Sequence, residues 1–385
     1  MQNTRLWTGA ALLFAALTEA SAAENDAAIA VIKAVRREGV GNEEAAVRWK
    51  ELVRSGPGAL TTIFHSFDGV DPVVANWLRT AINAICENEL AAGRKLPARQ
   101  FETFLKDTKR DPRARTFALD WLMAIDNDSR NRLLPGMIDD PSAGVRREAI
   151  AHAMDLGDAK GALSDAERRA HFQKLFVSAR DVDQVEEIAK KIKSLGGDEP
   201  SVLNHLGLIT RWELAGPFDN TGMKAFSESL PKVESWKEWA TAHPRAMVEL
   251  YQALGKKKGV ENDKKDAIYA LARTVIESPI EREVEIRAGT KNAVKIYVNG
   301  KEIFGRDEYH HGYKLDQHKA KATLKAGKNE IMLKVLQDDR TFNWTVEWEF
   351  QCRVCDSIGG TVPLKVLTAP NATPMKPVEP KKEKK

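Results

Sequence analysis

The feature that most constrains this chain is a change in hydrophobic period near residue 200. Before that point apolar residues recur with the 3.6-residue period of helices, and after it they alternate with period two, as in strands. All five Tyr lie beyond residue 250, and five of the nine Trp lie at or beyond Trp212. Residues 196–200 hold two glycines and a proline, a break that few helices cross. We therefore expect a multidomain α + β protein, helical first and then built of antiparallel strands.

Length and charge exclude several classes of protein. The 385 residues are enough for two to three domains of roughly 150 residues each. The mean hydropathy of −0.41 and the lack of an apolar run of about 20 residues exclude a multi-span membrane protein. The net charge is +4, but residues 371–385 hold five Lys and two Glu, which leaves about +1 for the remaining chain. Such a weak charge predicts no nucleic-acid partner.

The N-terminus has the pattern of a secretory signal peptide over residues 1–23. Arg5 supplies the positive charge, residues 6–17 supply a short apolar stretch, and Ala20-Ser21-Ala22 is a small-x-small cleavage site. The apolar stretch is too short for a permanent bilayer span. The alternative is the amphipathic start of a first helix. Export predicts a periplasmic or secreted protein with no transmembrane segment after signal removal.

The helical part contains three similar segments. They begin at Asp71-Pro72, Asp111-Pro112 and Asp140-Pro141, where Asp is expected as the N-cap and Pro as the first helical residue. Their starts lie 40 and 29 residues apart, so the repeat is imperfect. Residues 133–141, followed by Val145-Arg146-Arg147-Glu148-Ala149, resemble a HEAT repeat.

The resemblance implies an N-terminal α-α solenoid over residues 24–200 that binds a protein partner. Solenoids of this kind bury their apolar faces by stacking neighbouring repeats and bind partners on an extended surface. A compact helical bundle is the alternative.

The second part alternates like an antiparallel sheet. Val284 and Ile286 stand between charged residues, and residues 294–298 alternate in the same way. Asn299-Gly300 is a dipeptide typical of two-residue hairpin turns, and a second tight turn is expected at residues 326–329. Trp344, Trp348 and Phe350 are expected to face the core of a sandwich, with a sugar-stacking platform as the alternative.

Several of these segments resemble a jelly-roll module of secreted bacterial proteins. They are residues 212–220, 294–302, 324–329 and 333–335, and the module is similar to galactose-binding-like and PA14-like domains. The resemblance covers residues 208–367 and implies an antiparallel β-sandwich (jelly roll) that binds a glycan or an envelope component without catalysis. Residues 368–385, rich in Pro and Lys, are expected to be a disordered tail.

No catalytic motif stands out in the sequence. Nucleophile-elbow, zincin, Walker and dinucleotide-binding patterns do not occur in a useful context. We therefore expect no catalytic residue, no cofactor and no enzyme. The alternatives are a polysaccharide-active hydrolase whose carboxylates are dispersed in the sequence, or a purely structural envelope protein.

The best ligand candidate is the polar and aromatic segment of residues 305–318. Tyr309 offers a ring that stacks on a sugar face, and His310, His311 and Asp316 offer hydrogen bonds to hydroxyl groups. Because adjacent side chains point apart in an extended chain, His310 and His311 do not predict a metal site. The alternative is a long connection in which Tyr rings cover the sandwich edge and Asp316 fixes a turn.

The three cysteines allow one local disulfide. Cys86 falls in a helical pattern and is expected to be a buried apolar residue. Cys352 and Cys355 form either a disulfide or two unpaired thiols. Since residues i and i+3 lie on opposite faces of a strand, a disulfide requires the chain to turn at residues 353–354.

Overall fold

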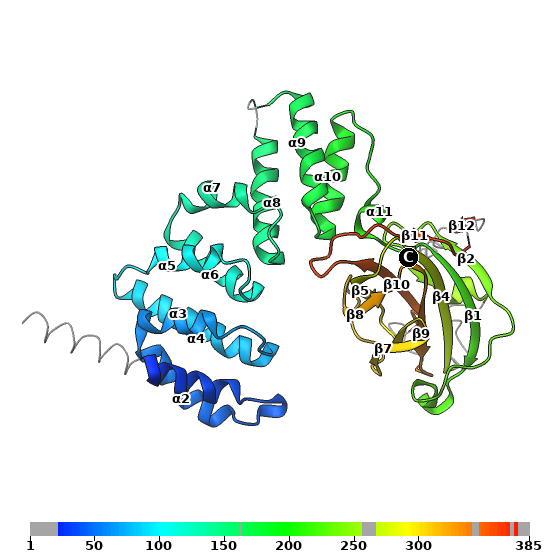
Figure 1. Cartoon of the computed structure of the whole chain (residues 1–385), viewed down its shortest axis with the longest axis horizontal. Coiled ribbons are helices and arrows are strands. Elements are labelled where there is room, and N and C mark those ends of the chain that lie inside the picture. Colours follow the sequence, from blue (N-terminus) through cyan, green and yellow to red (C-terminus); the bar gives the residue numbers. More distant parts are fainter. Residues whose placement is uncertain are drawn as a thin grey trace, which may run out of the picture. The chain divides into compact units, whose positions relative to one another are not determined.

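The computed structural model describes residues 22–159, 161, 163–255, 267–340, 346–369 and 373–375. The chain divides into two compact units, Met1–Gly197 and Asp198–Lys385. The described part of the first unit is helical, and that of the second consists mainly of strands (Figure 1). The expected α + β class is therefore confirmed. The predicted signal peptide lies outside the described residues except for positions 22 and 23, and most of the predicted tail lies outside them as well.

The helical unit begins with a helix over residues 22–33. Helices that lie near one another in the chain pack together, among them α4 with α6, α6 with α8, α8 with α9 and α9 with α10. The further elements are η1 (Arg37–Gly39), α2 (Asn42–Arg54), η2 (Gly56–Ala59), α3 (Leu60–His65), α4 (Pro72–Ala91), α5 (Ala98–Lys106), α6 (Pro112–Ile125), α7 (Ser129–Leu133), η3 (Leu134–Gly136), α8 (Ala143–Asp158), α9 (Asp165–Ser178) and α10 (Val182–Ser194). Among the helices of the described chain, none combines the length and the apolar character needed to cross a bilayer.

Two of the three expected Asp-Pro helix starts are present. Asp71 caps α4, where its Oδ1 accepts hydrogen bonds from the backbone N–H groups of Val73 and Val74, both at 2.9 Å. Asp111 caps α6 in the same way and accepts from the backbone N–H of Arg113 at 2.8 Å. In both helices proline follows the cap, where its missing N–H is no loss.

The third expected start is wrong. Helix α8 begins at Ala143, two residues after Pro141, and its N-cap residue is Ser142. The carboxylate of Asp140 instead binds the guanidinium of Arg115 in α6 through two contacts of 2.6 and 2.7 Å, and both side chains are buried. Since a buried arginine requires a compensating charge, this long-range pair replaces the local helix cap.

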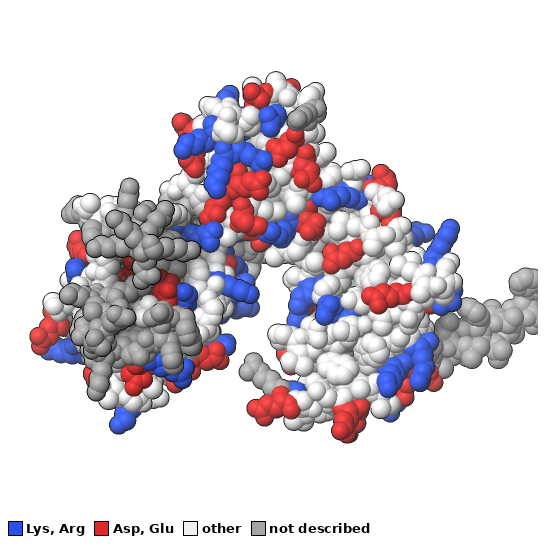
Figure 2. Space-filling view, turned by 180° about the vertical axis from the view of Figure 1, so that it is seen from behind, with Lys and Arg blue, Asp and Glu red and all other residues white. Residues whose placement is uncertain are grey.

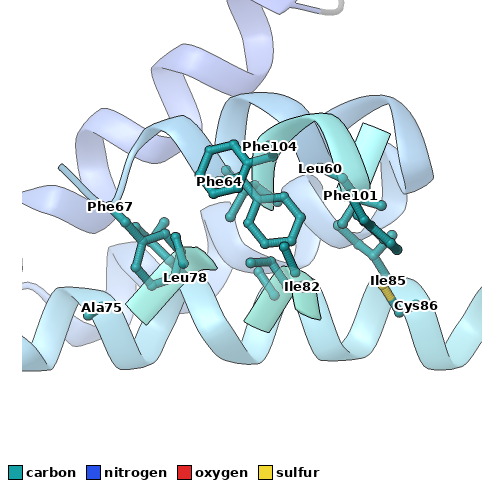
Figure 3. Packing of buried hydrophobic residues seen from close by; sticks show 14 of the residues in the cluster. Leu60, Phe64, Phe67, Ala75, Leu78, Ile82, Ile85, Cys86, Phe101 and Phe104 are labelled. Carbon is teal, nitrogen blue, oxygen red and sulfur yellow. The ribbon is translucent and has the colours of Figure 1, made fainter. Parts of the chain in front are cut away.

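The core of the helical unit is a continuous set of buried apolar side chains. Leu78, Ile82 and Ile85 of α4 are spaced four and three residues apart and lie on one buried face. Figure 3 shows Phe64 of α3 and Phe101 of α5 over this face. Cys86 belongs to the same core, as the sequence predicted.

The second unit is built mainly of short strands. They are β1 (Arg211–Asp219), β2 (Lys237–Thr241), β3 (Val248–Glu249), β4 (Ile268–Ser278), β5 (Arg282–Gly289), β6 (Ala293–Val298), β7 (Lys301–Arg306), β8 (His318–Leu324), β9 (Gly327–Gln337), β10 (Glu349–Cys355), β11 (Lys365–Val366) and β12 (Pro374–Met375). The helical elements of this unit are α11 (Val202–Leu206), η4 (Thr221–Phe226) and α12 (Leu250–Ala253).

The strands form two sheets. In the described residues, the larger sheet has the order β12-β2-β1-β4-β9-β6-β7, with β11 also paired to β4, and the smaller one has the order β3-β10-β5-β8. The strand pairs of the described chain are antiparallel, except that β12 runs parallel to β2.

Apolar side chains from both sheets share one core. The rings of Trp212 (β1) and Phe350 (β10) meet edge to face, with centroids 5.0 Å apart. Trp348 is 1% exposed, and its Nε1 donates to the carbonyl of Val335 at 3.1 Å. The core position predicted for Trp348 is thus confirmed, whereas Trp344 lies outside the described residues.

The first predicted turn is present, and the second comes earlier than the predicted residues 326–329, because β9 already begins at Gly327. Asn299 and Gly300 have φ angles of 50° and 80° between β6 and β7, as a two-residue hairpin requires. The turn before Gly327 joins β8 to β9, which belong to different sheets. There the side chain of Asn329 bonds both the N–H and the carbonyl of Lys325, at 3.0 and 2.8 Å. This turn therefore carries the chain from one layer to the other.

Candidate functional site

The predicted ligand segment lies between β7 and β8, where its polar groups bind other parts of the unit. The hydroxyl of Tyr309 accepts a hydrogen bond from Asn220 Nδ2 at 3.3 Å, and burial raises the pKa of Tyr309 to about 12. The Nε2 atom of His310 lies 2.6 Å from Asp338 Oδ1, and both side chains are 3% exposed. These two residues thus connect the segment to the residues that directly follow β1 and β9.

His311 and Asp316 have different partners. The Nδ1 atom of His311 lies 2.7 Å from Gln317 Nε2. Asp316 binds two buried arginines, with its Oδ2 2.8 Å from Arg287 Nη1 and its Oδ1 2.7 Å from Arg353 Nε. Burial alone would raise the pKa of Asp316, but the bonds from Arg353 and Arg287 hold it below its usual value.

The structure therefore gives each of the four predicted ligand residues its own partner within the fold. Asp316 has a φ of 60°, so it occupies a turn as the connection alternative expected. Sugar binding by these residues stays a prediction. Within the described ranges, no group of three or more His, Cys, Asp or Glu side chains is arranged to hold a metal ion.

The disulfide alternative for Cys352 and Cys355 is contradicted. Both thiols are free and buried, and β10 continues as a regular strand through both residues. Cys352 faces the core between the sheets, while the Cys355 thiol lies 3.8 Å from the carbonyl oxygen of Glu285. Because the strand does not turn at residues 353–354, the two side chains point to opposite faces.

A groove on the helical unit lies between α3 and α5 and has a volume of about 590 Å³. Its floor consists of Leu60 and Phe64 from α3 and of Phe101 and Phe104 from α5. The ring centroids of Phe64 and Phe104 lie 5.0 Å apart, and Figure 3 shows the two rings side by side. Such an aromatic floor is suited to an apolar side chain of a ligand.

Exposed polar side chains form the walls of this groove. Thr61 and Gln100 stand on opposite sides, with their side-chain oxygens 3.5 Å apart, and the ring of His65 lies against Phe104 with centroids separated by 5.4 Å. The groove thus combines an apolar floor with a polar rim, the usual anatomy of a binding site.

The two ends of the groove differ in charge. At one end Arg110 is neutralised by Asp107 and Asp68, at 3.0 and 3.2 Å. At the other end Arg99 is exposed, and it forms no salt bridge with the described part of the chain. On the face drawn in Figure 2, cationic and anionic side chains are interspersed. The end near Arg99 therefore attracts anionic groups.

A smaller hollow of about 340 Å³ lies between α4 and α6. Trp121 donates from Nε1 to Asn83 Oδ1 at 3.1 Å, and Asp120 lines the hollow beside them. Burial, and then the negative charge of Glu148, raise the pKa of Asp120. The hollow holds a single carboxyl group in its lining, whereas general acid–base hydrolysis of a glycoside uses two.

The groove could hardly be predicted from the sequence. Leu60, Phe64, Phe101 and Phe104 have the three- and four-residue spacings of ordinary core positions. The signal that was available is that α3 and α5 are short, with six and nine residues, so they cover less of the core than the longer helices do.

Comparison with known proteins gives few matches. No protein-family model matches the chain, and no curated protein matches it. Among solved structures, a β-glucosidase from Kluyveromyces marxianus, also solved in complex with glucose, is 12% identical with a TM-score of 0.28. The match covers 61% of this chain and 35% of the β-glucosidase.

A GH31 α-xylosidase from Xanthomonas citri is 15% identical with a TM-score of 0.21, over 39% of this chain and 16% of that enzyme. The chain thus spans about a third of the first relative and less of the second. At this level of similarity neither fold nor activity carries over to this chain.

Proposed function

We propose that this protein is a non-catalytic binding protein, exported to the periplasm or secreted. Its helical unit is a HEAT-like solenoid that binds a segment of a partner protein in the groove between α3 and α5. Its β unit is a galactose-binding-like jelly roll that binds a glycan or another envelope component. The observation that carries the proposal is the aromatic-floored groove with the exposed guanidinium of Arg99 at one end.

The groove specifies the chemistry of the partner segment. The floor of Leu60, Phe64 and Phe104 accepts large apolar side chains, and the exposed guanidinium of Arg99 favours an acidic residue beside them. We therefore commit to an acidic segment with one or two Leu- or Phe-sized anchors. Each anchor buried in the groove contributes about 1.5–3 kcal/mol, whereas each exposed charge contact contributes about 0–1 kcal/mol.

The apolar floor of the groove and the exposed Arg99 therefore contribute differently to binding. The apolar anchors supply most of the affinity, and the exposed charge of Arg99 sets the orientation of the segment and raises its association rate. Reversing the charge of Arg99 therefore weakens binding through its electrostatic part, whereas filling the groove removes the anchors and abolishes binding.

The proposal is tested by capture from the envelope fraction of the source organism with the mature protein as bait. The groove variant is Thr61→Arg, because Thr61 is exposed and an arginine there fills the groove without changing the core. The matched control is Thr108→Arg at an exposed turn residue outside the groove lining. We expect a protein captured by the wild type and the control but not by the groove variant. Equal capture by all three proteins contradicts the proposal.

The glycan half is tested with the same mature protein on a panel of glycans. Retention of a sugar that is lost in Tyr309→Phe or His311→Ala would place the ligand at the segment between β7 and β8. Capture of a protein partner without retention of any sugar would leave only the helical half of the proposal standing.

A further inference from the structure

Two of the four sheet edges in the described part of the β unit, those of β7 and β8, lie near each other. Strand β8 (His318–Leu324) ends the smaller sheet, and β7 (Lys301–Arg306) ends the larger one. In the part of the chain that the structure describes, β8 pairs with β5 only and β7 with β6 only. Each edge therefore presents a row of backbone N–H and C=O groups that an added strand can pair with.

A cleft of about 630 Å³ lies beside β8 and the hairpin of β6 and β7. Its apolar lining includes Val284 of β5, Val298 and Ile303 of the hairpin, and Ala322 of β8. Lys301 and Lys321 are exposed at the same cleft. Because Glu283, Glu285 and Asp356 also line the cleft, the free edge adjoins a space that has both apolar and charged walls and can receive side chains.

Side chains alternate along β8. Lys319 and Lys321 are exposed, whereas His318, Ala320 and Leu324 are buried. Neither lysine forms a salt bridge within the described ranges. The edge therefore offers positive charge on one face of the sheet and small apolar side chains on the other.

Strand β5, which already pairs with β8, shows which residues lie opposite the alternating side chains of β8. In β5, Glu285 lies opposite Lys321 and Val284 lies opposite Ala322, whereas Lys319 lies opposite Arg287, whose charge is neutralised by Glu285 and Asp316. Cross-strand neighbours of opposite charge stabilise a sheet, and like charges destabilise it. On its free side β8 presents Lys319 and Lys321 on one face, with Ala320 between them on the other, so an acidic residue opposite each lysine and an apolar residue between them are favoured.

We propose that the free edge of β8 binds an extended segment of another protein by strand addition. The segment alternates acidic residues, which face Lys319 and Lys321, with apolar residues, which enter the cleft lined by Val298 and Ile303. A second copy of this chain is disfavoured as the partner, because two β8 edges would bring lysines into the same cross-strand rows.

The probe is a fluorescein-labelled peptide, Glu-Val-Glu-Val-Glu-Val-Glu, titrated with the full mature protein and followed by fluorescence anisotropy. We expect saturable binding that the double variant Lys319→Glu with Lys321→Glu weakens by about tenfold or more, since two contacts of up to about 1 kcal/mol each are reversed in sign. The control is Lys232→Glu with Lys365→Glu, which makes the same charge change at exposed positions elsewhere in the unit. We expect the control to bind like the wild type.

A second peptide separates strand addition from plain charge attraction. It has the same sequence but carries N-methyl groups on alternate amides, which removes the donors needed for a strand ladder. We expect its binding to be lost and the unmodified peptide to slow hydrogen exchange in residues 318–324. No binding of the first peptide, equal binding of both peptides, or equal losses in the two double variants would each overturn the proposal.

Discussion

The buried ion pair of the helical unit provides a sharp test of how this unit is held together. Arg115 is 1% exposed; its Nε and Nη2 donate to the carbonyl of Leu105 at 2.9 and 2.6 Å, and it binds Asp140 through two contacts. Asp140 Oδ1 also accepts from the backbone N–H of Ser142 at 2.8 Å. The pair thus connects the ends of α5, α6 and α8, and Asp140→Asn removes its negative charge while keeping its shape.

Loss of one partner from a buried pair costs about 3–5 kcal/mol, because the other charge stays buried without compensation. Asparagine keeps part of the hydrogen bonding, so we expect a loss of about 3 kcal/mol in the free energy of unfolding. With a urea m-value of about 2 kcal/mol/M, the midpoint falls by about 1.5 M. The measurement is urea unfolding followed by circular dichroism at 222 nm, which reports mainly on the helical unit.

The control is Glu51→Gln, which breaks the exposed pair of Glu51 with Arg48, whose side chains are 44% and 50% exposed. This change costs less than about 0.5 kcal/mol, because exposed ion pairs contribute little. If Asp140→Asn shifts the midpoint no more than Glu51→Gln does, the reasoning about the buried pair is refuted.

Three further predictions concern the β unit and the thiols. Burial, followed by the charges of His311 and Arg306, lowers the pKa of His318 to about 4. The neutral imidazole of the folded state therefore contributes its full stabilisation above pH 6.5. As the pH falls toward 4, the free energy of unfolding of the β unit decreases by up to about 3 kcal/mol. We expect His318→Gln to flatten this dependence in urea unfolding between pH 7 and 5, and an unchanged slope would contradict the assignment. Gly207 has a φ of 69°, and a Cβ atom there would lie 2.5 Å from the carbonyl oxygen of Val354. We expect Gly207→Ala to lower the free energy of unfolding by about 1–3 kcal/mol. The control Gly255→Ala, where no atom lies within 4 Å of the added Cβ, should lower it by less. The three cysteines are free and buried. Without reductant, Ellman's reagent should therefore react with no thiol in the folded protein and with three thiols after unfolding. A single reactive thiol after unfolding would indicate a disulfide.

Local sequence signals predicted the local structure of this protein well. Asp71 and Asp111 cap their helices because the partners of their side chains lie two or three residues away. The alternating residues 284–286 and 294–298 form parts of β5 and β6, and Asn299-Gly300 forms the turn after β6. In each case the information lies within a few neighbouring residues.

The predictions are wrong where contacts between residues far apart in the sequence determine the structure. Asp140 does not cap a helix because Arg115, 25 residues earlier in the chain, binds its carboxylate. His310 and Asp316 suggested a ligand site because the sequence does not show that Asp338, Arg287 and Arg353 come to lie beside them. A polar segment with distant internal partners is indistinguishable in sequence from one that awaits a ligand.

The groove between α3 and α5 is the claim on which the proposed function depends, and site-specific photo-crosslinking tests it most directly. A p-benzoylphenylalanine residue in place of the exposed Gln100 lies in the groove wall, and one in place of Thr108 serves as the control. In the envelope fraction of the source organism, we expect a discrete crosslinked protein from position 100 that disappears with Thr61→Arg. The same crosslink from position 108, or its persistence in the Thr61→Arg variant, would contradict the account.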